Sequence, residues 1–256
     1  MNSFIKTVVI VGLGSIGRRH VRVIKSIFPD INIIALRHKQ CNNYDMNTLG
    51  LYKCVTSLNE VFKLNPQVAI ISNPASKHME IAKKLARRGV SLLIEKPISN
   101  SSKDVQELID ICCQNKVTLM TGYNLRFLPS LIEFKKQVNS KMIGKIYSVR
   151  SEIGQHLSSW RPGTDYRNGV SAQKFLGGGA LLELSHEIDY LLWIFGKVDW
   201  VKSHISRQSD LEIDVEDNAH VIMGFENVSG SVLTVSLNVD FIRHDVTRRC
   251  FAIGEK

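Results

Sequence analysis

A run of β-branched residues that leads directly into three spaced glycines constrains the fold of this chain most strongly. Residues 8–11 read Val-Val-Ile-Val, and the pattern G-x-G-x-x-G follows them at Gly12, Gly14 and Gly17. Apolar residues then recur at helical spacing over 18–28, and Pro29 ends the segment. A strand, a tight turn and a helix N-terminus in this order form a cradle for a pyrophosphate. We therefore predict a dinucleotide-binding unit here, with a purely structural turn as the alternative.

Each position of this loop has an expected role. Gly12 permits the tight turn, Gly14 allows the backbone to approach a phosphate, and Gly17 lets the helix pack closely on the strand. Ser15 and Ile16 open the helix and are expected to contact the cofactor through the helix N-terminus.

Composition sets the broad class. The 256 residues are 44% hydrophobic and 22% charged, which fits one large or two modest globular domains. Neither a membrane-spanning apolar run nor a secretory signal pattern is evident, so we expect a cytoplasmic protein with no membrane partner. The formal charge of +9 comes from scattered basic residues, which suits anionic metabolites better than nucleic acid. Five cysteines without metal-site spacing are predicted to be reduced: Cys41, Cys54, Cys112, Cys113 and Cys250.

Strand-like and helix-like segments alternate through the first half. Further strands are predicted at 31–36, 68–72, 90–95 and 117–121, and helices at 57–64, 77–88 and, behind a serine cap, 101–115. This alternation predicts an α/β fold: a doubly wound Rossmann sheet of parallel strands, with ligands at the carboxyl ends of the strands.

The pattern changes at about Tyr123, so we predict a dinucleotide-binding domain at 1–122 and an α+β substrate and oligomerisation domain at 123–256. The second domain is expected to contain an extended segment at 144–153, one helix over 179–195 and antiparallel strands within 198–253. Two strand faces are predicted, one from Val221, Met223 and Phe225 and a weaker one from Val232, Thr234 and Ser236. The join lacks flexible-linker composition, so close packing with a cleft is expected.

Several motifs, taken in order, carry a family resemblance. They are the glycine loop, Asn73-Pro74 with His78, Glu95-Lys96-Pro97, Gly122 to Phe127 (GYNLRF), and Gly177 to Gly179 followed by His186 and Asp189. Together they resemble the glucose-fructose oxidoreductase, inositol dehydrogenase and MocA (Gfo/Idh/MocA) family of NAD(P)-dependent oxidoreductases. The helix start Ile16 to His20, Ala35 to Arg37, Trp160 to Arg167 and Asp210 to Asp217 more narrowly resemble a bacterial branch linked to sialic-acid-like and surface sugars.

The resemblance implies hydride transfer between a nicotinamide and a carbinol carbon of a sugar-like substrate. It places Lys96 beside the substrate, where a lysine polarises a carbonyl or relays a proton; a surface salt bridge with Glu95 is the alternative. His186 is a proton carrier near neutrality, unless it is a satisfied core histidine. Glu183, three residues earlier, is expected on the same helical face. The common family pattern has an aspartate four residues before the histidine, so Glu183 departs from it in both residue type and spacing. Asp189 is expected either to orient the imidazole or to serve a structural role alone.

Cofactor choice depends on the end of the second strand. No acidic residue stands between Ile31 and Gln40, whereas Arg37 and His38 do, and this favours a 2′-phosphate, hence NADP over NAD. An exposed basic turn is the alternative. By resemblance, Asn73, Pro74, His78, Glu95, Lys96 and Asn124 complete the cofactor contacts.

For the substrate we predict contacts from Lys96, His186 and six aromatic or basic residues: Tyr123, Arg126, Trp160, Arg161, Tyr166 and Arg167. Aromatic rings stack on sugar faces and arginines bind carboxylates or phosphates; loop packing is the alternative for Tyr166 and Arg167. No metal site is evident in the sequence.

Two other functions remain open from sequence: a dinucleotide-binding regulatory or scaffold protein without turnover, and nonspecific nucleic-acid binding from net charge alone. Because family members generally continue beyond a strand like 248–253, we also expect a C-terminally truncated second domain with an exposed sheet edge. Homo-oligomerisation through that sheet is expected.

Overall fold

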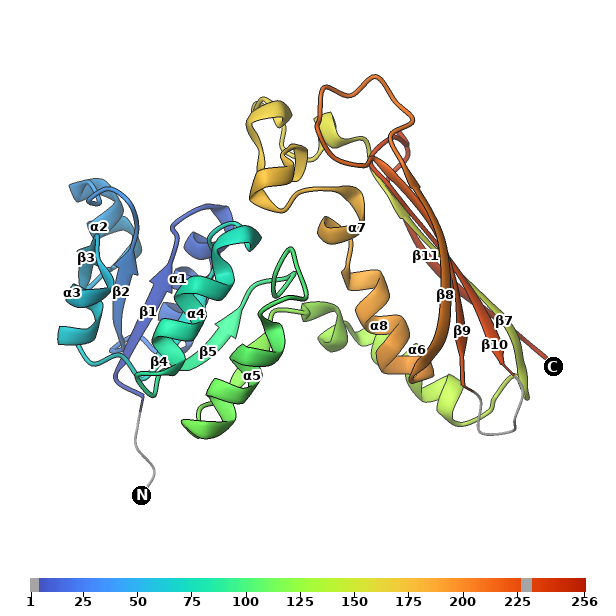
Figure 1. Ribbon diagram of the computed structural model, residues 1–256, viewed down its shortest axis with the longest axis horizontal. Helices are drawn as coiled ribbons and strands as arrows, with labels where there is room; N and C mark the ends of the chain where they lie inside the picture. Colours follow the sequence, from blue (N-terminus) through green and yellow to red (C-terminus); the bar gives the residue numbers. More distant parts are fainter. Residues whose placement is uncertain (1–4, 227–231) are drawn as a thin grey trace. The chain divides into compact units, whose positions relative to one another are not determined.

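The computed structural model describes residues 5–226 and 232–256. The chain divides into two compact units, residues 1–122 and 123–256. Both are shown in Figure 1, and each is described separately below.

The first unit is built on a six-stranded sheet in which every pairing is parallel. The strand order is β3-β2-β1-β4-β5-β6, the order of a doubly wound dinucleotide-binding sheet. Its strands are β1 (Thr7–Val11), β2 (Asn32–Leu36), β3 (Lys53–Val55), β4 (Val68–Ile71), β5 (Ser91–Ile94) and β6 (Leu119–Thr121). The predicted Rossmann sheet is confirmed.

Helices cover both faces of this sheet, as Figure 1 shows. One face packs against α1 (Ser15–Ile27) and α2 (Asn43–Leu49), and the other packs against α3 (Leu58–Lys63), α4 (His78–Ala86) and α5 (Val105–Gln114). All five residues of β1 are buried, because a central parallel strand is apolar on both sides. A short 3-10 turn, η1 (Ala75–Lys77), precedes α4.

Three details of the first unit differ from the sequence prediction. Helix α2 and strand β3 were not predicted, because seven-residue and three-residue elements show too little periodicity. The helix expected from residue 101 begins at Val105, after Asp104, and no side chain caps it. The predicted serine cap is therefore wrong: the Ser101 hydroxyl accepts the Lys103 backbone N–H within the preceding turn instead.

The cysteines are not all reduced. Cys41 and Cys54 form a disulfide that joins the loop after β2 to strand β3, whereas Cys112, Cys113 and Cys250 are free. The odd number of cysteines and their irregular spacing gave no sign of this pair. The fold that brings the two residues together was also not predicted, because α2 and β3 lie between β2 and α3 in the unpredicted stretch.

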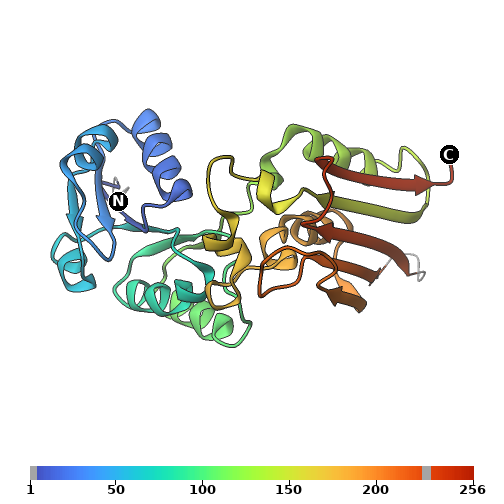
Figure 2. The ribbon, with the colours of Figure 1, turned by 90° about the horizontal axis from the view of Figure 1, so that it is seen from above.

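The second unit is built on a five-stranded mixed sheet of order β11-β7-β10-β9-β8. Its strands are β7 (Ile146–Gly154), β8 (Val198–Ser206), β9 (Asn218–Phe225), β10 (Leu233–Asp240) and β11 (Thr247–Gly254). Only β7 and β10 pair in parallel, so the predicted mainly antiparallel sheet is confirmed. Figure 2 shows β11, in dark red, beside β7.

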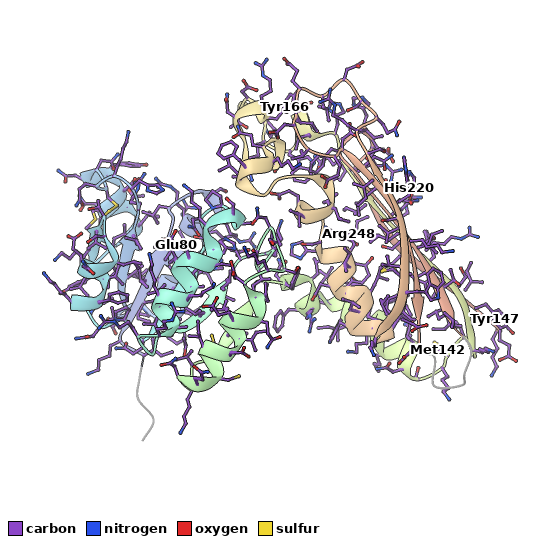
Figure 3. The ribbon with its side chains drawn as sticks, in the orientation of Figure 1. Glu80, Met142, Tyr147, Tyr166, His220 and Arg248 are labelled. Atoms are coloured by element: carbon purple, nitrogen blue, oxygen red, sulfur yellow. A yellow bond between two sulfur atoms is a disulfide. The ribbon has the colours of Figure 1, made fainter. Side chains whose placement is uncertain are left out.

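Helices α6 (Pro129–Asn139), α7 (Ala180–Glu183) and α8 (His186–Phe195) accompany this sheet, and α6 and α8 lie along one of its faces in Figure 1. Within the described residues of this unit, the connections contain five 3-10 turns: η2 (Asn124–Phe127), η3 (Leu157–Ser159), η4 (Tyr166–Asn168), η5 (Val170–Ala172) and η6 (Lys174–Leu176). Figure 3 shows Arg248 on the helix side of the sheet and His220 on the opposite side.

Two expectations for this unit are wrong. The single helix predicted over 179–195 is broken, because α7 ends at Glu183 and α8 begins at His186. The face predicted from Val232 is out of phase: the buried residues of β10 are Leu233, Val235, Leu237 and Val239. A shift of one residue moves every strand side chain to the other face. The face of Val221, Met223 and Phe225 is confirmed, and the part of the predicted strand region at 227–231 lies outside the described residues.

Among the residues that the structure describes, no helix is long and apolar enough to cross a membrane.

Candidate functional site

The glycine loop has the geometry of a phosphate cradle. Gly12 has φ +89°, and a Cβ there would come within 3.0 Å of the Asn73 backbone nitrogen. A Cβ on Gly17 would collide with the Gly12 carbonyl oxygen, so both positions require glycine. Gly14 has no atom within 4 Å of where a Cβ would stand. The backbone is therefore open at Gly14, where the N-terminus of α1 favours an anion.

The end of β4 supports this loop and fits a nucleotide. The Ser72 hydroxyl donates to the Val11 and Gly12 carbonyls at 3.0 Å, which ties β4 to the turn after β1. In the described part of the chain, the buried Asn73 side-chain oxygen has no hydrogen-bond partner. A buried acceptor without a partner is costly, and a bound donor such as a ribose hydroxyl would satisfy it. With the open backbone at Gly14, this acceptor makes the residues present fit a nicotinamide dinucleotide.

His78 is buried, and its imidazole contacts the backbone of the turn after β4. Its Nε2 lies 2.7 Å from the Asn73 carbonyl oxygen, and its Nδ1 lies 3.1 Å from that of Pro97. Burial lowers the pKa of His78. The imidazole therefore joins the turn after β4 to the turn after β5 instead of facing solvent.

Arg37, at the end of β2, is paired with an acid that the sequence analysis missed. The Asp45 carboxylate on α2 lies 2.8 Å from an Arg18 nitrogen and 3.3 Å from an Arg37 nitrogen. Hydrogen bonding from Arg18, with the charges of both arginines, lowers the pKa of Asp45. Asp45 was missed because the search for a carboxylate stopped at residue 40. The sequence signal that could have indicated this helix is Asn42, which caps α2 by accepting the Asp45 backbone N–H.

Glu95 ties α1 to the Glu-Lys-Pro turn. His20 Nε2 lies 2.6 Å from Glu95 Oε1, and the Lys96 backbone N–H donates to Oε2. Burial raises the pKa of Glu95, but the His20 hydrogen bond and the neighbouring positive charges outweigh burial and lower it. A Cβ at Gly122 would approach Oε2 to 3.1 Å, so the end of β6 also packs on this carboxylate. Glu95 is thus fixed from three elements, and it fixes the backbone of Lys96.

In the second unit, His186 is the first residue of α8 and Glu183 is the last of α7. The Tyr123 ring meets the His186 imidazole edge-on at 5.6 Å between centroids, and the Tyr123 hydroxyl is 3.5 Å from the Ser185 hydroxyl. Burial raises the pKa of Tyr123, which keeps its hydroxyl protonated. Because the helix is broken, the premise that Glu183 and His186 share one helical face is wrong.

Asp189 is held by Arg126. Two guanidinium nitrogens of Arg126 donate to the two carboxylate oxygens at 2.7 and 2.9 Å. The pair joins η2 to α8, which gives Asp189 a structural contact. Asn124 and Tyr123 belong to the same turn region as Arg126.

A buried polar group lies next to His186 on the sheet side of α8. Glu187 has no exposed surface, and its Oε1 accepts from Arg248 at 2.9 Å. Burial raises the pKa of Glu187. One turn further along α8, the Tyr190 hydroxyl is 2.6 Å from the Ser151 hydroxyl of β7. These groups fix α8 on the sheet, and the sequence analysis did not single them out. The one sequence feature that could have indicated them is the acidic residue Glu187 directly after His186.

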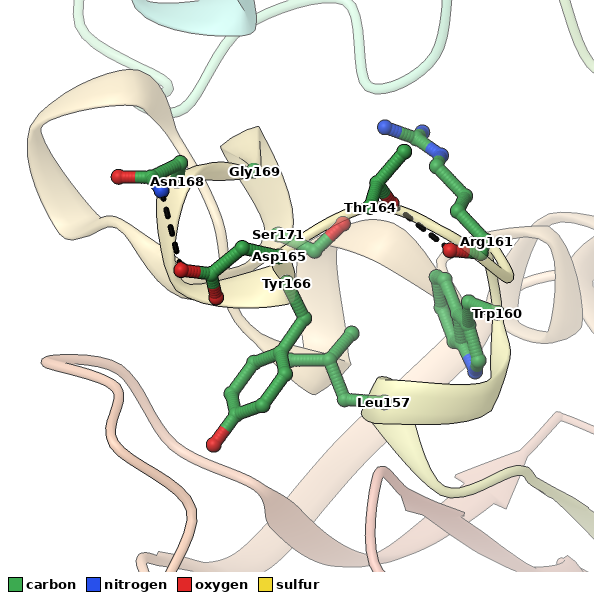
Figure 4. A pocket seen from close by; sticks show the side chains of 9 residues that line it. All are labelled: Leu157, Trp160, Arg161, Thr164, Asp165, Tyr166, Asn168, Gly169 and Ser171. Atoms are coloured by element: carbon green, nitrogen blue, oxygen red, sulfur yellow. Dashed lines mark hydrogen bonds between the residues drawn. The ribbon is translucent and has the colours of Figure 1, made fainter.

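A pocket of about 310 Å³ lies in the loop that contains η3, η4 and η5 (Figure 4). Its lining comprises Leu157, Trp160, Arg161, Thr164, Asp165, Tyr166, Asn168, Gly169 and Ser171. Three of the predicted substrate residues, Trp160, Arg161 and Tyr166, therefore share one pocket. Arg167 does not line it; its guanidinium pairs with Asp165 at 2.8 Å and Glu212 at 3.0 Å.

The predicted residues thus fall into two sets. The first unit holds the predicted cofactor contacts at the ends of its strands: Gly12, Gly14, Ser15, Ile16, Gly17, Arg37, His38, Asn73, Pro74, His78, Glu95 and Lys96. The second unit holds Asn124, Glu183, His186 and the predicted substrate residues other than Lys96.

Comparison with known proteins decides the family. Residues 6–123 match the family described as "Oxidoreductase family, NAD-binding Rossmann fold", and residues 131–256 match the "GFO/IDH/MocA C-terminal domain". The chain belongs to the Gfo/Idh/MocA family. The resemblance drawn from the sequence motifs is confirmed.

Individual Gfo/Idh/MocA relatives are distant. The rhizopine catabolism protein MocA of Rhizobium meliloti is 25% identical over 73% of this chain and 56% of its own length. The 2,7-anhydro-N-acetylneuraminate hydratase of Mediterraneibacter gnavus is 27% identical over 65% of this chain and 44% of its own length. The chain thus spans about half the length of these curated relatives.

Solved structures confirm the Gfo/Idh/MocA fold. The WlbA dehydrogenase of Bordetella pertussis, crystallised with NADH and UDP-GlcNAcA, superposes with a TM-score of 0.84 at 20% identity. That match covers 98% of this chain and 77% of the other. At such low identity the superposition establishes the fold alone.

Proposed function

We propose that this protein is an NAD(P)-dependent oxidoreductase that transfers a hydride between the nicotinamide and a carbinol or keto carbon of a sugar-like substrate. The observation that carries the proposal is the first unit's loop, with an open backbone at Gly14 and an unsatisfied Asn73 oxygen beside it, in a family of oxidoreductases. Nonulosonic-acid or surface-sugar metabolism is the proposed setting, in the cytoplasm.

The first unit supplies all of the proposed cofactor contacts except Asn124, which belongs to the second unit. Gly12, Gly14 and Gly17, with Ser15 and Ile16, hold the pyrophosphate at the N-terminus of α1. Asn73 and Pro74 border the ribose, and Asn124 is assigned to the nicotinamide end. When bound, the nicotinamide supplies the hydride chemistry, whereas the protein positions the reactants and handles the proton.

Lys96 and His186 are assigned to the proton of the reacting hydroxyl. Lys96 is supported by its backbone, which Glu95 and His20 fix in place. His186 is supported by its position at the first turn of α8, against the Tyr123 ring. An imidazole can accept and return a proton near neutrality. Glu183 remains a third candidate, at the end of α7.

NADP remains the proposed preference over NAD, although one ion pair in the structure weakens the case for it. Arg37 and His38 stand where a 2′-phosphate would bind, but the Asp45 carboxylate takes up part of the Arg37 charge. Exchanging Arg37 for Asp should shift preference from NADP toward NAD; an unchanged preference would reject Arg37 as the phosphate contact.

The decisive experiment separates binding from turnover. Fluorescence titration with NADPH and NADH measures cofactor binding, and a screen over nucleotide sugars and nonulosonic acids measures turnover. Lys96→Ala should retain cofactor binding and abolish turnover, whereas Lys103→Ala, on the exposed turn before α5, should change neither. Cofactor binding with no turnover of any substrate would favour a regulatory or scaffold protein instead.

We also propose a homo-oligomer formed through the five-stranded sheet. Apolar side chains are exposed on one face of its strands, among them Ile222, Phe251 and Ile253 at 45%, 53% and 44%. Grouped exposed apolar residues of this kind are typical of an interface. Light scattering after size exclusion tests it, and Ile222→Lys should shift the chain toward monomer.

A further inference from the structure

The three arginines predicted to bind substrate differ in what their guanidinium groups already contact. Arg126 donates two hydrogen bonds to Asp189, and Arg167 pairs with Asp165 and Glu212. For the Arg161 guanidinium the structure shows no carboxylate partner within the described residues, and this residue lines the pocket. Arg161 is therefore the arginine whose charge is available to a ligand there.

The rest of the lining determines what kind of ligand fits. Figure 4 shows Arg161 and Trp160 on one side of the pocket and Asp165 and Asn168 on the other. The Asp165 carboxylate is already engaged by Arg167, whose hydrogen bonds lower the pKa of Asp165; Arg167 also pairs with Glu212. The indole of Trp160 is fixed by donating to the Gln155 carbonyl and by an edge contact with Phe241.

These contacts leave three kinds of surface for a ligand. Trp160 and Leu157 offer an apolar wall, Asn168 and Ser171 offer polar groups suited to hydroxyls, and Arg161 offers a guanidinium that no described carboxylate engages. The volume of about 310 Å³ is at the small end of ligand pockets, so it suits one ring better than a whole nucleotide sugar.

We propose that this pocket binds the ring of an acidic sugar, a uronic or nonulosonic acid, with Arg161 binding the carboxylate. The proposal rests on the proposed function and deepens it, because it names the substrate class that the second unit selects. Arg161 matches a carboxylate through its planar fork of donors, and a single guanidinium balances a single negative charge.

The test uses binding and requires no turnover. Calorimetry and saturation-transfer NMR on the full chain compare glucuronate, galacturonate and N-acetylneuraminate with their neutral methyl esters, with and without saturating NADH or NADPH. Glucose 1-phosphate probes a phosphate in place of the carboxylate. The variants are Arg161→Met and, as a matched control, Arg249→Met on β11, whose side chain is 58% exposed and does not line the pocket.

We expect at least one acid to bind the wild type about tenfold or more tightly than its ester, as expected for a charge-assisted hydrogen-bonded pair. Arg161→Met should remove this difference and Arg249→Met should retain it. Equal binding of every acid and its ester, tighter binding of glucose 1-phosphate, or an unaffected Arg161→Met would each overturn the proposal. The comparison of acid and ester binding to the wild-type chain tests the proposal even if a variant fails to fold. If acids bind through Arg161 but no substrate is turned over, the proposed oxidoreductase function is rejected and the proposed acid-binding pocket is retained.

Discussion

His20 Nε2 lies 2.6 Å from Glu95 Oε1, so a residue of the phosphate-binding helix directly holds the carboxylate that precedes Lys96. The other oxygen of Glu95 accepts the Lys96 backbone N–H. Neither residue is exposed. His20 is therefore a positioning residue for Lys96, acting through Glu95.

Replacing His20 should lower turnover more than cofactor binding. His20→Leu removes the hydrogen bond to Glu95 and frees the turn, so we expect kcat to fall about tenfold or more while KM for the cofactor changes little. His20→Gln places an amide N–H near the position of Nε2 and should restore most of kcat.

Arg22→Leu, two residues further along α1 at an exposed position, is the matched control and should behave as wild type. Steady-state kinetics with cofactor titrations separates kcat from KM. An equal loss for the Leu and Gln variants would mean that His20 only supports the packing of α1.

Asp45 should restrain the affinity for NADP. It shares its carboxylate between Arg18 and Arg37, so Asp45→Asn releases charge beside the end of β2. We expect the NADPH-to-NADH affinity ratio to rise about threefold or more, since a charged guanidinium is then available to the 2′-phosphate. Fluorescence titration measures both cofactors. Asp30→Asn, an exposed change before β2, is the control; a fall in the ratio would mean that Asp45 instead holds Arg37 ready for the phosphate.

Long periodic elements of this fold could be predicted from sequence, and short ones could not. The apolar runs of β1 and β4 and the glycine loop between β1 and α1 identify the parallel sheet, because a buried strand has a continuous apolar sequence. Helix α2 and strand β3 have no such pattern. They bring Asp45 to Arg37 and Cys54 to Cys41, so both pairings were invisible from sequence.

The candidate site shows the same limit. Motif order gave Lys96 and His186, but contacts between residues far apart in sequence decide what their neighbours do. Arg126 and Asp189 are 63 residues apart, and only the fold shows that one satisfies the other. The break at Ser185 escaped periodicity because apolar residues continue on both sides of it; Ser185 faces the Tyr123 hydroxyl and caps no backbone group.

The Arg126 and Asp189 pair should be strongly coupled in stability. Asp189 is buried and Arg126 half exposed, so either single change to Leu should cost about 1–2 kcal/mol in the free energy of unfolding. The double change should cost clearly less than the sum, because the second substitution removes a charge already without its partner. All three tryptophans, Trp160, Trp193 and Trp200, lie in the second unit, so their fluorescence in urea reports on it. Additive costs would contradict the coupling.

The stability that Asp45 gives the first unit should depend on pH in one direction. Arg18 and Arg37 lower the pKa of Asp45 in the folded chain. A carboxyl of this kind contributes its full stability above the ordinary aspartate pKa of about 4, and the contribution is lost as the pH falls through the lowered folded value. Wild type should therefore exceed Asp45→Asn in stability by a constant amount between about pH 5 and pH 7, and the gap should narrow below about pH 4. Amide signals of residues 32–49, followed by NMR during urea titration, measure it. The exposed Asp30→Asn variant should show no such narrowing, and a gap that widens in acid would refute the ion pair.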